Sequence, residues 1–119
     1  MTKALRVLDY LSHILNAIKR IERYTADMDE MAFLNTELVQ DAVIRNIEII
    51  GEASNNIQRV DATFAAQHDD IPWQVIYTMR NRVSHGYHKM DLEIVWKTIQ
   101  SDLPDLYQQV QALATACGA

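Results

Sequence analysis

The segment that decides the fold runs from Val39 to Ile57 and reads VQDAVIRNIEIIGEASNNI. Its apolar residues recur at steps of three and four, a spacing that places them along one face of a helix. This stripe consists of Val39, Val43, Ile47, Ile50, Ala53 and Ile57, and it is widened by Ile44 and Ile49. We therefore expect a long central helix that begins after Asn35 or Thr36, either of which is a suitable N-cap.

Gly51 lies inside this expected helix, where a glycine costs about 1 kcal/mol relative to alanine. A helix tolerates such a residue mostly where another backbone passes close by, so we expect a close helix–helix contact there. Glu52 follows directly, next to the apolar face. It is either a solvated helix carboxylate or a group that binds a partner or pairs with an arginine.

Similar apolar stripes predict helices on both sides of this segment. The first runs from Lys3 to Tyr24. A later one starts within Asp69–Trp73, where acidic residues and a first-turn proline suit a helix N-terminus, and it stops at Gly86. A short helical piece is expected over 29–33, and a loop or weak helix over 60–70.

Asp91 is the expected cap of the following helix, whose stripe includes Leu92, Val95 and Trp96. Pro104 should kink or restart this last helix because proline removes a backbone donor. The sequence therefore predicts an all-α, up-and-down bundle of four to five helices, with the last helix kinked or broken near Pro104. We expect a single domain over residues 1–119.

Composition narrows the function. Apolar residues make up 49% of the 119 residues, enough for a core, although pairing with a second subunit would help so small a domain. The net charge of −5 argues against a general nucleic-acid coat, which would be basic. No apolar run is long enough to span a membrane, and the N-terminus lacks an apolar signal core, so we expect a cytoplasmic protein. Cys117 is the single cysteine, which excludes an internal disulfide.

The candidate functional centre is the string Arg80–Tyr87, RNRVSHGY. Histidine can take or give a proton near neutral pH, and arginine can stabilise negative charge on phosphorus. Because the RNA 2′-hydroxyl is itself the nucleophile, these two residue types suffice for RNA cleavage without a metal. The products would carry a 2′,3′-cyclic phosphate and a 5′-hydroxyl. The string belongs to a local basic cluster on an otherwise acidic chain, formed by Arg80, Arg82, His85, His88 and Lys89.

Plainer interpretations compete with this one. An arginine near a helix C-terminus is common because it complements the helix dipole. His85 and His88 are three residues apart, but two histidines without cysteines or a carboxylate set are weak evidence for a metal, and we expect none. The aromatic residues Trp73, Trp96 and Tyr107 are expected in the core rather than as platforms for stacking bases.

The motif Arg80-x4-His85-x-Tyr87, with Ile71-Pro72-Trp73 before it and Val95-Trp96 after it, resembles the HEPN fold of HepT-type toxins. The stretch Arg45–Ala53 is similar to the central helix of this family, and Asp91 and Leu103-Pro104 also match. The resemblance covers nearly the whole chain and is weakest over 25–35 and 61–69.

This resemblance implies a homodimer in which the Arg–His segments of two subunits face one RNA-binding cleft. Arg80 and His85 would be the catalytic pair, with Asn81 in support and no cofactor. The partner would be an antitoxin of the MNT type, a minimal nucleotidyltransferase that transfers AMP from ATP to Tyr87. The added bulk and negative charge would block access of RNA. Candidate contacts to RNA or to the partner are Arg82, Ser84, His88, Lys89 and Glu52.

A second interpretation is a non-catalytic HEPN module that binds a nucleotide or a nucleotidyltransferase partner through Arg80 and His85. It predicts complex formation without RNA cleavage. A purely structural bundle without any ligand explains poorly an Arg-Asn…His-Gly-Tyr string that is expected to be exposed.

Overall fold

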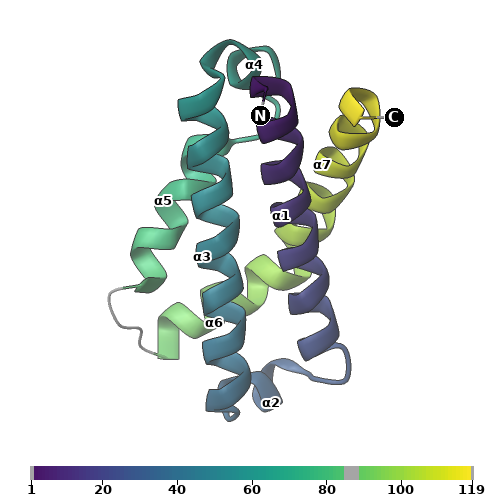
Figure 1. The fold of residues 1–119 in the computed structure, drawn as a ribbon. Helices are drawn as coiled ribbons and strands as arrows, with labels where there is room; N and C mark the ends of the chain where they lie inside the picture. The colour runs from purple at the N-terminus through teal and green to yellow at the C-terminus, as the bar shows by residue number, and fades with distance from the viewer. Residues whose placement is uncertain (1, 85–88, 119) are drawn as a thin grey trace.

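Four long helical segments alternate in direction along the molecule (Figure 1). The computed structural model describes the backbone of residues 2–84 and 89–118, and the side chains of 2–80 and 91–118. The segments are α1 (Lys3–Thr25), α3 (Glu37–Val60), α5 (Trp73–Ser84) and a last one that joins α6 (Lys89–Lys97), a π-helix η1 (Thr98–Asp102) and α7 (Leu103–Gly118). The described part contains no strand, so the all-α, up-and-down bundle is confirmed.

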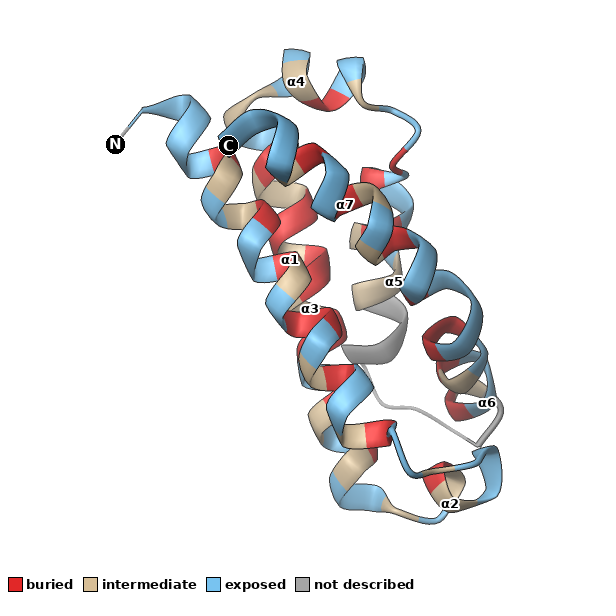
Figure 2. Cartoon of the chain, turned by 90° about the vertical axis from the view of Figure 1, so that its right-hand side faces the viewer, coloured by how far each residue is buried: buried red, intermediate tan, exposed pale blue. Residues whose placement is uncertain are grey.

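The central helix α3 packs against α1 on one side and α5 on the other, while α7 packs against α1. The buried faces of α1, α3 and α7 turn toward one another (Figure 2). Most residues of the stripe predicted for α3 are buried, and the two exceptions, Val39 and Ile49, are half-buried. The segment that was expected to decide the fold therefore lies at the centre of the core.

Two short helices connect the long ones, and an aspartate begins each of them. In α2 (Glu30–Leu34), the Asp29 carboxylate accepts a hydrogen bond from the Ala32 N–H at 2.8 Å. In α4 (Ala62–Gln67), Asp61 accepts from the Phe64 N–H at 3.1 Å. Both helices are therefore N-capped, because a side-chain oxygen accepts a hydrogen bond from an otherwise unpaired N–H of the first turn. The segment 60–70 thus contains a short helix.

Of the expected caps of two longer helices, one is confirmed in position and one is wrong. Thr36 is the N-cap residue of α3, as predicted, but its hydroxyl donates to the Ala32 carbonyl at 2.7 Å and makes no capping hydrogen bond to α3. The helix expected to be capped by Asp91 already begins at Lys89, so Asp91 lies in its first turn. A carboxylate in the first turn still favours the helix through the helix dipole.

The last helix changes its winding directly before Pro104, as predicted. The Leu103 N–H donates to the Thr98 carbonyl, five residues back, which makes Thr98–Asp102 a π-helical turn. In a regular α-helix the ring of Pro104 would clash with the carbonyl four residues earlier, and a wider turn avoids this geometry.

None of the helices within the described ranges is both long and apolar enough to cross a membrane.

Candidate functional site

Helix α5 carries Arg80 across the middle of α3, at Gly51. A Cβ atom added to Gly51 would lie 2.8 Å from the Cβ of Arg80, closer than such atoms approach in proteins. Only glycine therefore allows α5 to pack this tightly against α3. The close helix–helix contact expected from a glycine inside α3 is confirmed.

The guanidinium of Arg80 binds the carboxylate of Glu52, the residue that follows Gly51. The Nη2 of Arg80 donates to the Oε1 of Glu52 at 2.8 Å. The two side chains are 30% and 47% exposed, so the ion pair lies at the surface end of the α3–α5 contact. Of the alternatives for Glu52, pairing with an arginine is the one that the structure shows.

Tyr77 contacts the same guanidinium from within α5. It lies three residues before Arg80, on the same side of the helix, and the Cζ of Arg80 is 5.8 Å from the centre of its ring. A cation at this distance from an aromatic face is attracted to it. The Nε of Arg80 is buried and has no hydrogen-bond partner among the residues with described side chains. Arg80 is therefore held by the Gly51 backbone, the Glu52 carboxylate and the Tyr77 ring.

The remaining residues of the predicted site are placed only in part. The backbone of Asn81, Arg82 and Ser84 forms the last turn of α5, and Lys89 begins α6. The side chains of these four residues lie outside the described part of the chain. The predictions for His85, Tyr87 and His88, and for Gly86 as the helix stop, also fall outside it. The structure thus brings Arg80 together with Glu52 and adds Tyr77, which is not among the predicted site residues.

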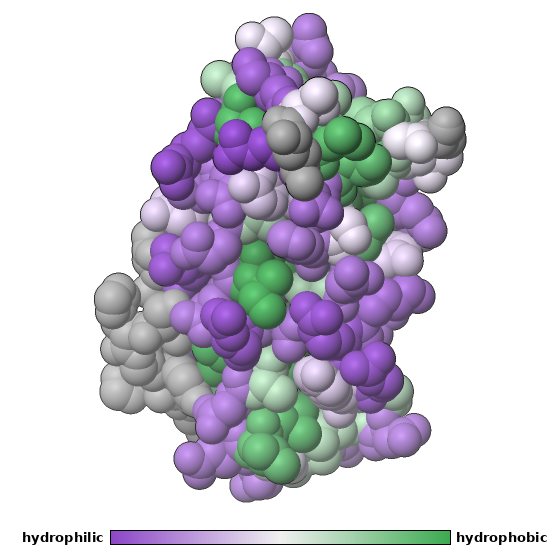
Figure 3. Space-filling model, in the orientation of Figure 1, coloured by the Kyte–Doolittle hydropathy of each residue, from purple (hydrophilic) through white to green (hydrophobic). Residues whose placement is uncertain are grey.

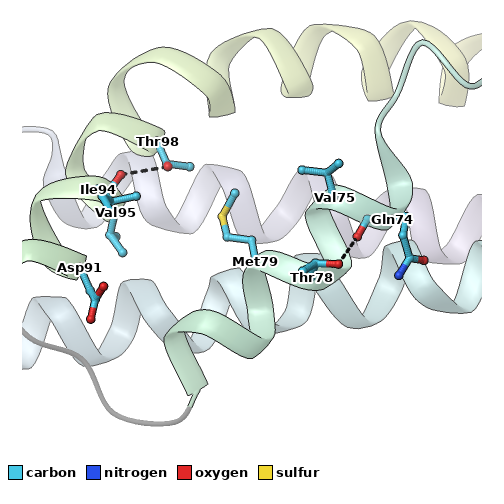
Figure 4. A pocket seen from close by; sticks show the side chains of 8 residues that line it. All are labelled: Gln74, Val75, Thr78, Met79, Asp91, Ile94, Val95 and Thr98. Carbon is cyan, nitrogen blue, oxygen red and sulfur yellow. Dashed lines mark hydrogen bonds between the residues drawn. The ribbon is translucent and has the colours of Figure 1, made fainter.

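A groove follows a different face of α5 (Figure 4). It has a volume of about 270 Å³ and is lined by Val75, Thr78 and Met79 of α5 together with Ile94 and Val95 of α6. A second, adjoining groove of about 420 Å³ reaches down to Ile47 and Ile50 of α3. Neither Arg80 nor Glu52 lines these grooves, so they are separate from the Arg80 contact.

The described side chains contain no group of three histidine, cysteine, aspartate or glutamate residues placed to hold a metal ion. His85 and His88, which the sequence raised as a weak metal candidate, lie outside that part. Trp73 is buried, and Trp96 and Tyr107 pack half-buried against the core, so the prediction that these aromatic residues serve the core is confirmed.

The chain is similar to known proteins over almost its whole length. Residues 14–113 match the family described as "Ribonuclease HepT-like". A "Probable ribonuclease HepT" of Thermococcus cleftensis is 40% identical over 88% of this chain and 93% of its own. A "Putative RNase" of Caldanaerobacter subterraneus is 31% identical over 87% of this chain and 90% of its own.

A longer relative comes from Methanocaldococcus jannaschii and is named "Gamma-glutamylcyclotransferase and putative RNase". It is 40% identical over 85% of this chain, which spans only 44% of that protein. No solved structure gives a significant match to the chain.

Proposed function

The chain belongs to the HepT-like ribonuclease family, and from this premise we propose that it is a metal-independent RNA endonuclease and the toxin of a type VII toxin–antitoxin pair. The observation that carries the proposal is the placement of Arg80. Its guanidinium is held at the surface of the α3–α5 contact by three neighbours. Its helix continues in the sequence toward His85, five residues later. A histidine that transfers protons and a fixed cation that stabilises charge on phosphorus suffice to cleave RNA without a metal.

The reaction uses the 2′-hydroxyl of the RNA. His85 accepts its proton as the 2′-oxygen attacks the adjacent phosphorus, and the bond from phosphorus to the 5′-oxygen breaks. The departing 5′-oxygen takes up a proton, which leaves a 2′,3′-cyclic phosphate and a 5′-hydroxyl. Arg80 stabilises the charge that develops on the phosphoryl oxygens. Asn81 orients His85 or holds a phosphate oxygen, and Arg82, Ser84, His88 and Lys89 supply further contacts to RNA or to the partner protein.

Regulation is proposed to act two residues beyond His85, at Tyr87. A cognate minimal nucleotidyltransferase of the MNT type transfers AMP from ATP to the Tyr87 hydroxyl and releases pyrophosphate. Each added nucleotide brings a negatively charged phosphate to a site that must admit RNA phosphates, so it repels and obstructs the substrate. In this proposal the toxin is a cytoplasmic homodimer with two Arg–His segments in one cleft.

One observation favours a second candidate function. The guanidinium of Arg80 is fixed by Glu52 and stays 30% exposed, which suits binding as well as catalysis, so in this candidate a non-catalytic subunit holds a nucleotide or a nucleotidyltransferase through Arg80 and His85. This candidate predicts a stable complex with the nucleotidyltransferase and no RNA cleavage.

One experiment tests both candidates. The protein is purified alone and together with the product of the neighbouring open reading frame, and each sample is incubated with RNA in EDTA. We expect the protein alone to release 5′-hydroxyl ends, and Arg80→Ala or His85→Ala to cleave at least about 100-fold more slowly. The matched controls are Arg6→Ala and His13→Ala, two exposed residues of α1, which should cleave at the parent rate.

The co-purified sample is also weighed by intact-mass spectrometry. We expect the mass of the protein to rise by one or more AMP groups, and this rise to be absent in Tyr87→Phe. The modified protein should no longer cleave RNA. Cleavage by His85→Ala at the parent rate would refute the ribonuclease mechanism. A complex that forms without any cleavage by the unmodified protein would favour the non-catalytic subunit.

A further inference from the structure

We propose that Glu52 is a positioning residue for Arg80, holding its guanidinium in the orientation in which it receives the RNA phosphate. The inference rests on the proposed ribonuclease function. It replaces the expectation that Glu52 contacts RNA or the partner protein, because the carboxylate pairs with Arg80 and, placed against RNA phosphates, would repel them.

The contact follows from the register of α3 against α5. Gly51 receives the Cβ of Arg80 at its backbone, so the base of the arginine side chain is fixed by packing. The next residue, Glu52, reaches the far end of the same side chain with its carboxylate 2.8 Å from Nη2. Two consecutive residues of α3 therefore fix both ends of one side chain. An arginine ordered in advance loses less rotamer freedom when it binds phosphate, which favours catalysis.

The pair leaves Arg80 able to bind an anion. A guanidinium has five N–H donors, and the described ion pair joins the carboxylate to one nitrogen, Nη2. The side chain remains 30% exposed, with the Tyr77 ring beside it. Glu52 thus restricts where the guanidinium points without covering it.

Stability does not account for this ion pair. Pairs between groups as exposed as Glu52 and Arg80 contribute little to the folded state, because solvent screens them. Removing the carboxylate should therefore leave the melting temperature almost unchanged. A positioning role predicts instead that the catalytic step slows, which separates it from a structural role.

The test compares two substitutions of Glu52 by steady-state RNA cleavage, with melting temperatures measured alongside. Glu52→Ala removes the acceptor, and we expect kcat to fall about tenfold while KM changes less than kcat. Glu52→Gln keeps an oxygen acceptor at the same place, and we expect it to restore most of kcat. The matched control is Glu22→Ala, because Glu22 is 46% exposed and forms an ion pair with Lys19 at 3.9 Å, away from Arg80; it should leave kcat unchanged.

A double-mutant cycle shows whether Glu52 acts through Arg80. In an Arg80→Lys background, which keeps the charge and some activity, we expect Glu52→Ala to lower kcat by less than twofold. An equal loss in both backgrounds, or parent kinetics in Glu52→Ala, would overturn the positioning role and leave the ribonuclease proposal standing. A folded parent protein that cleaves no RNA would overturn the ribonuclease proposal, and the positioning role with it.

Discussion

At Gly51 the lack of one methyl group sets how closely α5 approaches α3. Alanine is about 1 kcal/mol better than glycine inside a helix, but overpacking a tight contact typically costs about 1–3 kcal/mol. The atom opposite is the Cβ of Arg80, at 2.8 Å, which cannot swing aside as the end of a long side chain could. The clash should therefore outweigh the gain in helix propensity.

We expect Gly51→Ala to lower the free energy of unfolding by up to about 2 kcal/mol in urea denaturation, which is the overpacking cost less the gain in helix propensity, and to slow RNA cleavage by displacing Arg80. Ser54→Ala is the matched control, since Ser54 is fully buried on the same helix and its hydroxyl donates only to the Ile50 carbonyl of that helix. The free energy of unfolding of Ser54→Ala should fall by less than about 1 kcal/mol. A Gly51→Ala variant about 1 kcal/mol more stable than the parent would show that α5 can shift without cost, because only the gain in helix propensity would remain.

Single residues differed in how far the sequence revealed their roles. Gly51 was recognisable because a glycine inside a long apolar stripe has a known cost that something must offset. Glu52 was left between two interpretations, because its partner lies far away in the sequence on another helix. Tyr77 has no role in the sequence-based prediction, although its spacing of three residues before Arg80 on one helix is the signal that indicates the contact. The catalytic roles of Arg80 and His85 stay predictions from their chemistry and a family resemblance, and the modification of Tyr87 stays a prediction from the resemblance alone.

At the scale of elements, Trp73 ties the start of α5 to α4. Its side chain is 3% exposed, and its indole N–H is 3.2 Å from the carbonyls of both Ala65 and His68. Phenylalanine is smaller and could not donate to these carbonyls. Each carbonyl keeps a backbone donor, the N–H of His68 for Ala65 and the N–H of Ile71 for His68, so the loss is that of the indole hydrogen bond, about 0.5–1.5 kcal/mol, and of the packing of the larger ring.

We therefore expect Trp73→Phe to lower the free energy of unfolding by about 1–3 kcal/mol, from the lost hydrogen bond and the space left by the smaller ring, measured by urea denaturation. Trp96→Phe is the comparison. Trp96 is only half-buried and packs on Phe33 with ring centres 5.4 Å apart, a contact that phenylalanine can keep. A loss in Trp73→Phe no larger than in Trp96→Phe would show that the two hydrogen bonds contribute nothing.

The helices themselves were predictable, whereas their ends were less so. Apolar periodicity predicted the long helices because each one buries a single face in the core. Thr36 is the N-cap residue of α3 but makes no capping hydrogen bond, and the cap at Asp91 is wrong, because the end of a helix depends on local hydrogen bonds that periodicity does not contain. The break before Pro104 followed from proline chemistry, but its form, a π-helical turn over Thr98–Asp102, came only from the structure.

At the scale of the molecule, the surface combines an acidic net charge of −5 with separate apolar patches. Figure 3 shows one face on which hydrophilic side chains surround isolated hydrophobic ones. Large apolar side chains are exposed at Met31 (68%), Leu38 (81%) and Val75 (65%). A chain of this size gains stability when a partner covers such residues.

We expect a homodimer in solution, with a mass by light scattering of twice 13.7 kDa. Two subunits that each carry −5 repel one another, so association must come mainly from burial of apolar surface, which salt does not screen. The dimer mass should therefore persist in about 0.5 M salt, and the melting temperature should rise with protein concentration by mass action. A mass of 13.7 kDa at every concentration, in a sample that still cleaves RNA, would mean that one Arg–His segment suffices for the reaction.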